Sequence, residues 1–282
     1  MGVVRDVSTI TIGGDIVVNR MGFGAMRLCG PGIWGEPDDP QGARAVLRRA
    51  VELGVQLIDT ADAYGPEVNE HQIADALSPY PEDLLIATKG SGTRASRDDW
   101  GIDGSPEHLR EACEASLRRL GLERIDLYQL HGVDPKIPIE ESVGALAELQ
   151  SEGKIRHIGV SNVDESELER AQGVTRIASV QNEYNVANRA SEGLMRACER
   201  EEMAFLAYFP VGAGWRAAKP VKALEPIAKK HEATIQQVAL AWLLRHSPVI
   251  VPIPGTSSIP HLEENMAAAD VRLDKEDLAA LG

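Results

Sequence analysis

Short apolar runs that end in a polar residue alternate with helix-forming segments through most of the chain. The runs have the length of strands, and the segments between them carry apolar faces at helical spacing. Strict alternation of this kind predicts a parallel sheet covered by helices. Eight such units in 282 residues fit a closed (β/α)8 TIM barrel. The expected strands are residues 20–26, 55–59, 84–89, 125–131, 155–160, 178–183, 203–208 and 249–253.

Two additions to the barrel are expected, one at each end of the chain. Two β-rich runs, 9–12 and 16–18, flank Gly13-Gly14-Asp15, which predicts an N-terminal β-hairpin. Extra helices are expected after the last strand, and the whole chain, 1–282, is interpreted as a single domain. The expected helices are 43–53, 70–77, 105–120, 140–151, 165–171, 189–201, 221–231, 234–246, 260–268 and 275–281; residues 28–39 and 90–104 are expected as loops.

An open, doubly wound sheet is the alternative fold. Its glycine-rich dinucleotide fingerprint belongs near the start of the chain, and none is found there. A late match to G-x-G-x-x-A spans Gly212 to Ala217 after a strand, and one such match is a weak signal. We interpret it as a flexible loop over a phosphate.

The charge and the cysteines exclude several classes of protein. A net charge of −14 and a pI near 5.0 argue against nucleic acid as a partner. The three cysteines show no spacing typical of a metal site or a disulfide framework, so no metal is expected. The N-terminus lacks a signal-peptide core, and no apolar run approaches the ~20 residues of a membrane span. We expect a cytoplasmic protein without a membrane partner, and a monomer by default.

Four ionisable side chains lie at or just after the ends of three consecutive expected strands: Asp59, Tyr64, Lys89 and His131. In a barrel the carboxyl ends of all strands meet at one face, where active sites lie. Each side chain alone has a structural explanation, such as a turn cap, aromatic packing, a solvated lysine or a structural histidine. Their shared position predicts a site at the mouth of the barrel.

Six short segments that carry polar residues lie at or next to the ends of these strands. They are 58–65 (IDTADAYG), 88–89 (TK), 126–131 (DLYQLH), 159–162 (GVSN), 181–185 (QNEYN) and 253–257 (IPGTS). Together and in this order, they resemble the signature motifs of the aldo-keto reductase superfamily, and the chain is similar to a short bacterial-type member. The resemblance covers nearly the whole chain.

The resemblance implies reduction of aldehydes and ketones by hydride transfer from a nicotinamide cofactor. Tyr64 would be the general acid, Lys89 and Asp59 would tune it, and His131 would orient the substrate carbonyl. The chemistry is consistent, since hydride delivery leaves charge on the carbonyl oxygen that a proton or a donor must meet. A phenol has a pKa of about 10, and an adjacent ammonium is expected to lower it.

The resemblance also implies where the cofactor is held. Ser161, Asn162 and Gln181 would bind the nicotinamide carboxamide. Tyr208 would stack on the nicotinamide face, although a core aromatic packed beside its neighbours is an alternative. The remaining cofactor residues implied are Gly24, Ala25 and Met26 at the ribose; Phe209, Pro210, Val211 and Gly212, within a backbone stretch to Gly214, at the pyrophosphate; and Glu264 and Asn265 at the adenine.

One departure from the family pattern concerns the 2′-phosphate of NADP. Many members place a lysine and an arginine around it, and the matching positions here are Gly255 and His261. Hydroxyls of Thr256, Ser257 and Ser258 remain, and backbone amides can form an anion nest. We expect NADP(H) as the cofactor, with use of NAD(H) as well.

A second departure concerns the substrate, because the chain lacks the long C-terminal loop of members with tight pockets. Trp34 and Trp100 are candidate walls beside Tyr64 and His131, as are Trp215 and residues 133–137; surface packing is the alternative for each tryptophan. Small aldehydes, ketones or quinones are the expected substrates.

Two other functions stay open. The first is a regulatory barrel that binds the cofactor and turns over poorly. The second is a barrel aldolase or isomerase with Lys89 as a Schiff-base lysine. That chemistry needs a depressed lysine pKa, whereas a neighbouring Asp59 would keep Lys89 charged.

Overall fold

The computed structural model describes residues 9–212 and 223–282, and it contains an eight-stranded sheet whose strands are all parallel. The sheet closes on itself, because Gly22 N donates a hydrogen bond to Pro252 O at 3.0 Å and Gly24 N donates to Pro254 O at 3.3 Å. The predicted (β/α)8 barrel is therefore confirmed. Its strands, in order around the barrel, are β3 (Phe23–Gly24), β4 (Leu57–Asp59), β5 (Leu85–Gly90), β8 (Ile125–Leu130), β9 (Ile155–Ser161), β10 (Ser179–Glu183), β11 (Ala204–Tyr208) and β12 (Ile250–Pro252).

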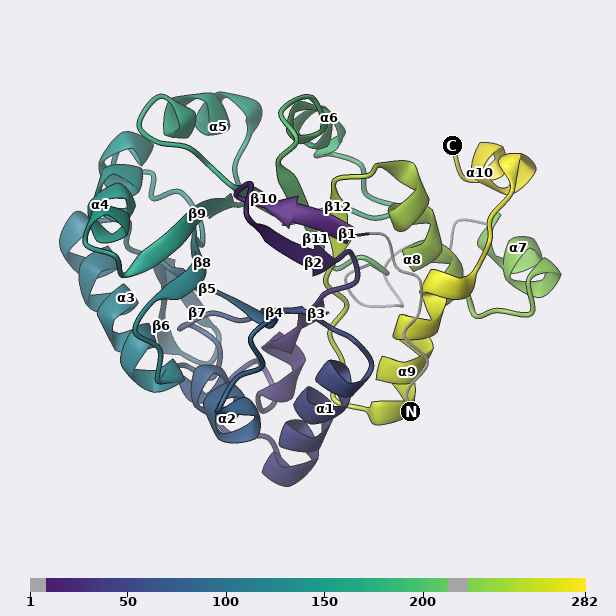
Figure 1. Ribbon diagram of the computed structural model, residues 1–282, viewed down its shortest axis with the longest axis horizontal. Helices are drawn as coiled ribbons and strands as arrows, with labels where there is room; N and C mark the ends of the chain where they lie inside the picture. Colours follow the sequence, from purple (N-terminus) through teal and green to yellow (C-terminus); the bar gives the residue numbers. More distant parts are fainter. Residues whose placement is uncertain (1–8, 213–222) are drawn as a thin grey trace.

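Helices surround the strands (Figure 1). Their ends follow local rules: in α3, Ser105 caps the first turn, Pro106 occupies the first position, and Gly121 ends the helix at φ 66°. Within the described residues the helices are α1 (Pro40–Glu52), α2 (Val68–Leu77), α3 (Pro106–Leu120), α4 (Ile139–Ser151), α5 (Glu165–Gln172), α6 (Glu192–Arg200), α7 (Leu224–Lys230), α8 (Ile235–His246), α9 (Ile259–Ala267) and α10 (Lys275–Leu281), with 3-10 turns η1 (Ala25–Leu28) and η2 (Ala268–Asp270).

The expected N-terminal hairpin forms from β1 (Thr9–Ile12) and β2 (Ile16–Asn19), and it lies across one end of the barrel (Figure 1). Ile12 and Val18 are fully buried in a cluster with residues that point into the barrel from β4, β5, β8, β11 and β12. The hairpin thus closes the end opposite to the one at which the strands finish.

Residues 90–104 were expected as a loop, and this expectation is wrong for most of the segment. Strands β6 (Gly92–Ser96) and β7 (Asp99–Ile102) pair in an antiparallel hairpin instead. The sequence does not reveal it because its residues are mostly polar and only partly buried, so the apolar alternation of a strand is missing. The Arg94 guanidinium, 3.7 Å from the Trp100 ring centroid, joins the two strands across the hairpin.

Some boundaries also differ from expectation. The first barrel strand is reduced to Phe23–Gly24, because residues 25–28 turn into η1. Helix α1 begins earlier than expected, at Pro40, because the Asp39 side chain caps it by accepting from Gly42 N. Helix α6 begins only at Glu192, after a turn in which the Asn188 side chain accepts a hydrogen bond from Ala190 N.

Several general properties can be stated for the described residues. No helix among them is long and apolar enough to cross a lipid bilayer. They contain no group of three or more His, Cys, Asp or Glu side chains placed to hold a metal ion. All three cysteines are buried and unpaired, and burial raises the pKa of each thiol to about 12, which keeps the thiols unreactive.

Candidate active site

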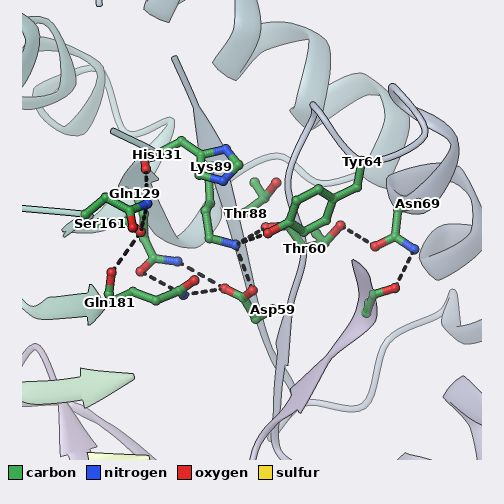
Figure 2. Close-up of polar contacts among 12 residues, drawn as sticks. Asp59, Thr60, Tyr64, Asn69, Thr88, Lys89, Gln129, His131, Ser161 and Gln181 are labelled. Carbon is green, nitrogen blue, oxygen red and sulfur yellow. Dashed lines mark hydrogen bonds and ion pairs between the residues drawn. The ribbon is translucent and has the colours of Figure 1, made fainter. Parts of the chain in front are cut away.

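The polar side chains at the ends of β4, β5 and β8 come together at the mouth of the barrel (Figure 2). Lys89 is at their centre and has no exposed surface. Its Nζ donates to Asp59 Oδ2 at 2.7 Å, to Thr60 O at 2.8 Å and to Tyr64 OH at 3.3 Å. All three protons of the buried ammonium therefore have acceptors, which offsets the cost of removing the charge from water.

The second oxygen of Asp59 is held from the other side of the barrel. Asp59 Oδ1 accepts from Gln181 Nε2 at 2.7 Å and from Gln129 Nε2 at 3.3 Å, and Gln181 Nε2 also lies 3.3 Å from Gln129 Oε1. The carboxylate thus has a partner on each oxygen, and the Asp59 residue is only 3% exposed. Such a network fixes the position of Lys89 relative to Tyr64.

The loop that carries Tyr64 is tied to α2. Thr60 Oγ1 donates to Asn69 Oδ1 at 2.7 Å, and Asn69 Nδ2 donates to Ala25 O at 3.1 Å. Asn69 N also donates to Tyr64 O at 3.1 Å. These buried bonds hold the loop that carries Tyr64 against the end of β4.

The pKa of Tyr64 differs from the sequence-based expectation. Burial raises it, while the Lys89 ammonium acts in the opposite direction, and the net effect is a pKa above the ordinary value of a phenol. Burial would lower the pKa of Lys89, yet the attraction of Asp59 and Tyr64 raises it overall. The expected lowering of the Tyr64 pKa is therefore wrong for the protein alone, and the phenol keeps its proton at neutral pH.

His131 lies against Tyr64, with the two rings edge to face and their centroids 5.7 Å apart. Burial, together with the Lys89 charge, lowers the pKa of His131 to about 3, so its imidazole is neutral at physiological pH. Its Nδ1 is buried without a hydrogen-bond partner among the described residues. A buried unpaired N–H is costlier than a buried lone pair, so we assign the ring proton to Nε2.

A cavity of about 410 Å³ opens above these side chains. The polar groups in it are ordered: Asn162 Nδ2 donates to His131 O at 2.9 Å, Tyr208 OH donates to Asn162 Oδ1 at 2.7 Å, and Ser161 Oγ donates to Gln181 O at 2.8 Å. Of the residues expected to hold a cofactor, those lining this cavity are Gly24, Met26, Asp59, Ser161, Asn162, Gln181, Tyr208, Phe209, Pro210, Val211, Gly212, Gly255 and Asn265.

The backbone around the cavity fits a bound dinucleotide. Asn162 and Phe209, which both line the cavity, have positive φ angles of 56° and 45°, a backbone conformation that is uncommon for non-glycine residues. Gly24 and Gly255 face each other where the barrel closes, and a Cβ on Gly24 would lie 2.7 Å from Ile253 O. Both glycines line the cavity, so side chains are missing along one wall, and an extended ligand can approach the backbone there.

The other expected cofactor residues lie elsewhere. Thr256 and Ser257 line a neighbouring cleft of about 880 Å³, which shares Met26 and Gly255 with the cavity. Ala25, His261 and Glu264 line neither space, and the Glu264 carboxylate accepts from Thr234 Oγ1 at 2.7 Å.

Of the expected substrate walls, Trp100, Tyr64 and His131 line the cavity. Trp34 does not line it and instead lies 5.3 Å from the Arg94 guanidinium. Trp215 and the second half of the G-x-G-x-x-A match lie outside the described residues.

Sequence reasoning missed three residues that the geometry brings to the site. Gln129 donates a hydrogen bond to Asp59, and the Arg94 guanidinium packs on the ring of Trp100 in the cavity wall. Arg27 lines both the cavity and the cleft. Gln129 could have been found, because it lies in β8 two residues before His131, which directly follows the strand, and side chains two residues apart in extended backbone point to the same side of a sheet.

Comparison with known proteins agrees with this geometry. The model of the Aldo/keto reductase family matches residues 20–282. Pyridoxine 4-dehydrogenase of Escherichia coli is 43% identical over 97% of both chains. The crystal structure of a thermostable aldo-keto reductase in complex with the inhibitor epalrestat superposes with a TM-score of 0.87, 32% identity and 98% of both chains covered.

A Klebsiella pneumoniae aldo/keto reductase, crystallised with NADP and acetate, has a TM-score of 0.81 and 29% identity, over 98% of this chain and 94% of its own. Members of the family draw hydride from NAD(P)H, so the cofactor class expected from the motifs is confirmed. With a family match over nearly its full length and a close relative of matching length, the chain belongs to the aldo/keto reductase family of NAD(P)H-dependent oxidoreductases.

Proposed function

We propose that the protein reduces aldehydes to alcohols with NADPH and that Tyr64 gives the proton to the carbonyl oxygen. One observation carries the proposal: Tyr64 OH, the Lys89 ammonium and the His131 ring meet at the floor of a cavity lined by Ser161 and Asn162. A carbonyl oxygen placed between Tyr64 and His131 would face two hydrogen-bond donors, next to the fixed positive charge of Lys89.

Ser161, Asn162 and Gln181, which line the cavity, would hold the nicotinamide of the cofactor, and Tyr208 would lie against its ring. When bound, it supplies the hydride. The side chains of the protein supply the proton and stabilise the charge that develops. Tyr64 is protonated at neutral pH because burial raises its pKa, so it is ready to act as an acid. Lys89 remains cationic and stabilises the phenolate as the proton leaves, while Asp59 holds Lys89 in place.

His131 has a separate role in this mechanism. Because its pKa is lowered to about 3, the ring is neutral and does not add a second charge beside Lys89. With the proton on Nε2, it donates a hydrogen bond to the carbonyl oxygen and orients the carbonyl for attack. The bond strengthens as negative charge develops on that oxygen.

Aromatic aldehydes are the substrate class that we propose to test first. The flat ring of Trp100 and the apolar side chain of Ile33 line the cavity together with Tyr64 and His131. The relative that is 43% identical carries the name pyridoxine 4-dehydrogenase, whose substrate is an aromatic alcohol. Pyridoxal, the corresponding aldehyde, is therefore the first candidate substrate, and 4-nitrobenzaldehyde is a reactive comparison.

The test is the consumption of NADPH and NADH with each aldehyde, with the alcohol product identified by mass spectrometry. We expect saturable turnover with NADPH and formation of one alcohol per cofactor oxidised. Tight NADPH binding without turnover of either aldehyde would instead favour a cofactor-binding regulatory barrel. A substrate adduct on Lys89 trapped by borohydride would favour a Schiff-base enzyme, which the charged state of Lys89 argues against.

A further inference from the structure

Of the two cations that many family members place at the 2′-phosphate of NADP, the one at position 255 is replaced by glycine, and the structure shows why it cannot be restored there. A Cβ on Gly255 would lie 2.5 Å from Gly24 O, a backbone atom that cannot move aside without opening the barrel seam. No side chain therefore fits at position 255 in this backbone. If this protein prefers NADPH, its positive charge has to come from another element.

Arg27 lies next to this gap. It belongs to η1, directly after the first barrel strand, and its Cγ would be 3.5 Å from a Cβ placed on Gly255. Its side chain thus occupies the space beside Gly255. Arg27 lines the cavity that contains Tyr64 and Asn265, and it also lines the cleft that contains Thr256 and Ser257.

The Arg27 guanidinium is available for a ligand. Arg27 is exposed and has no hydrogen bond or ion pair with any residue in 9–212 or 223–282. Arg97, the other arginine that lines the cleft, packs its side chain against Gly32 and does not line the cavity that contains Asn265. Arg94 lines neither space and already donates to Ile33 O, Gly32 O and Arg97 O. Asp38, Asp39 and Asp98 also line the cleft, so an anion there needs a cation close to it.

We propose that Arg27 supplies the positive charge for the 2′-phosphate of NADPH, from the first βα connection of the barrel rather than the last. Its planar guanidinium can bind two phosphate oxygens at once, and Thr256 and Ser257 hydroxyls complete the site from the other side. The inference rests on the cofactor of the proposed function, but it does not depend on the substrate or on Tyr64.

The test measures binding without catalysis. Dissociation constants for NADPH, NADH, 2′,5′-ADP and ADP are obtained by isothermal titration calorimetry for the wild type and for Arg27→Met, Arg27→Lys and Arg48→Met. Arg48 is an exposed arginine of α1 that lines neither space, so Arg48→Met is the matched control for loss of charge.

For Arg27→Met we expect NADPH and 2′,5′-ADP binding to weaken by about 10- to 100-fold, the effect of losing a charge-assisted contact. Binding of NADH and ADP should change by less than about threefold. Arg27→Lys should recover part of the loss, because lysine keeps the charge without the two-pronged geometry. Arg48→Met should match the wild type. Raising the salt concentration should weaken NADPH binding more in the wild type than in Arg27→Met.

Two results with Arg27→Met would overturn the proposal: unchanged affinity for NADPH, or an equal loss of affinity for NADH and NADPH, which would assign Arg27 to the pyrophosphate. A wild type that binds NADPH no more tightly than NADH would also overturn it. Inactivity toward aldehydes with the expected binding pattern would leave this inference standing and contradict the proposed function alone.

Discussion

Lys89 shows how single residues set the chemistry of this barrel. A buried ammonium is costly unless all of its protons are accepted, and here Asp59, Thr60 and Tyr64 accept them. Removing Asp59 would leave that charge without its counterion, whereas removing Tyr64 would leave the ion pair intact. The ion pair of Asp59 and Lys89 therefore has a structural role besides the proposed catalytic one, and variants of Asp59 should be less stable than variants of Tyr64.

The pH dependence of reduction tests the protonation states of the site. Because the pKa of His131 is lowered to about 3 and that of Tyr64 is raised, neither group ionises near neutrality. We expect kcat/KM for NADPH-dependent reduction to stay flat between about pH 5 and pH 8. It should fall only at alkaline pH, as Tyr64 loses the proton that it donates. A break in the pH profile of kcat/KM near pH 6.5 that is absent from His131→Asn would show that the histidine titrates in the free enzyme.

Asp62 carries a second residue-scale prediction. Burial, with repulsion from Glu70, raises its pKa from 3.8 to about 8, and its Oδ1 is buried without a partner. A carboxyl whose pKa is raised on folding stabilises the fold fully at acid pH and loses that contribution as pH rises toward the folded-state pKa. Asp62→Asn cannot ionise, so we expect it to be more stable than the wild type at pH 8, by on the order of 1–3 kcal/mol.

Thermal unfolding across about pH 4 to pH 9 checks this prediction for Asp62→Asn, with Glu82→Gln, an exposed carboxylate, as the control. The advantage of Asp62→Asn should grow with pH and vanish at the acid end. An advantage that is constant with pH, or is shared by Glu82→Gln, would show that ionisation of Asp62 is not the cause.

The sequence predicts which side chains meet at the mouth of the barrel better than it predicts their environment. Asp59, Tyr64, Lys89 and His131 are predictable, because each stands at or next to the end of an apolar run and parallel strands bring those ends together. The raised pKa of Tyr64 is not, because it depends on how completely the surrounding loops exclude water. That burial comes from contacts distant in sequence, which no local pattern contains.

At the scale of elements, the β6–β7 hairpin shapes the entrance to the cavity. Its Arg94 guanidinium lies 3.7 Å from the Trp100 ring centroid and 5.3 Å from that of Trp34, and it donates to Ile33 O at 3.1 Å. Trp100 lines the cavity but is 46% exposed. Because so much of its ring is not packed, its position depends on the contact with Arg94. The sequence names both tryptophans, but the arginine between them is visible only after folding.

Replacement of Arg94 should therefore alter substrate binding more than chemistry. In Arg94→Met we expect KM for an aromatic aldehyde to rise by about 3- to 30-fold, as expected for loss of a cation–π contact and its hydrogen bonds. KM for a short aliphatic aldehyde and the affinity for NADPH should change little, since neither depends on the Trp100 wall. Equal losses for both aldehydes, or loss of NADPH binding, would contradict this role.

At the scale of the whole molecule, one end of the barrel is packed and the other end holds the candidate site. The β1–β2 hairpin fills one end with Ile12 and Val18, while the site occupies the other. Ile12→Ala should lower the free energy of unfolding by about 2–4 kcal/mol, because it leaves a cavity in a closed core. Val17, which is 56% exposed on the same hairpin, provides the control, and Val17→Ala should change the stability by less than about 0.5 kcal/mol.

Denaturant unfolding followed by tryptophan fluorescence measures both variants, and kcat of the folded Ile12→Ala protein should stay near that of the wild type. A large loss of kcat in a well-folded Ile12→Ala protein would mean that the hairpin and the site are coupled. The fold itself could be predicted at this scale, because eight strand–helix units leave few alternatives, and the hairpin was marked by its two glycines.

Replacement of Tyr64 by phenylalanine tests the central claim most directly. The measurement pairs the rate of NADPH oxidation with 4-nitrobenzaldehyde and the affinity for NADPH, in the wild type and in Tyr64→Phe. Because Asp59 and Thr60 still accept protons from Lys89 in the variant, the site should remain folded. We predict that kcat falls by at least about 100-fold while the dissociation constant for NADPH changes by less than about threefold. A Tyr64→Phe protein that binds NADPH normally and reduces the aldehyde at a near-normal rate would contradict the account.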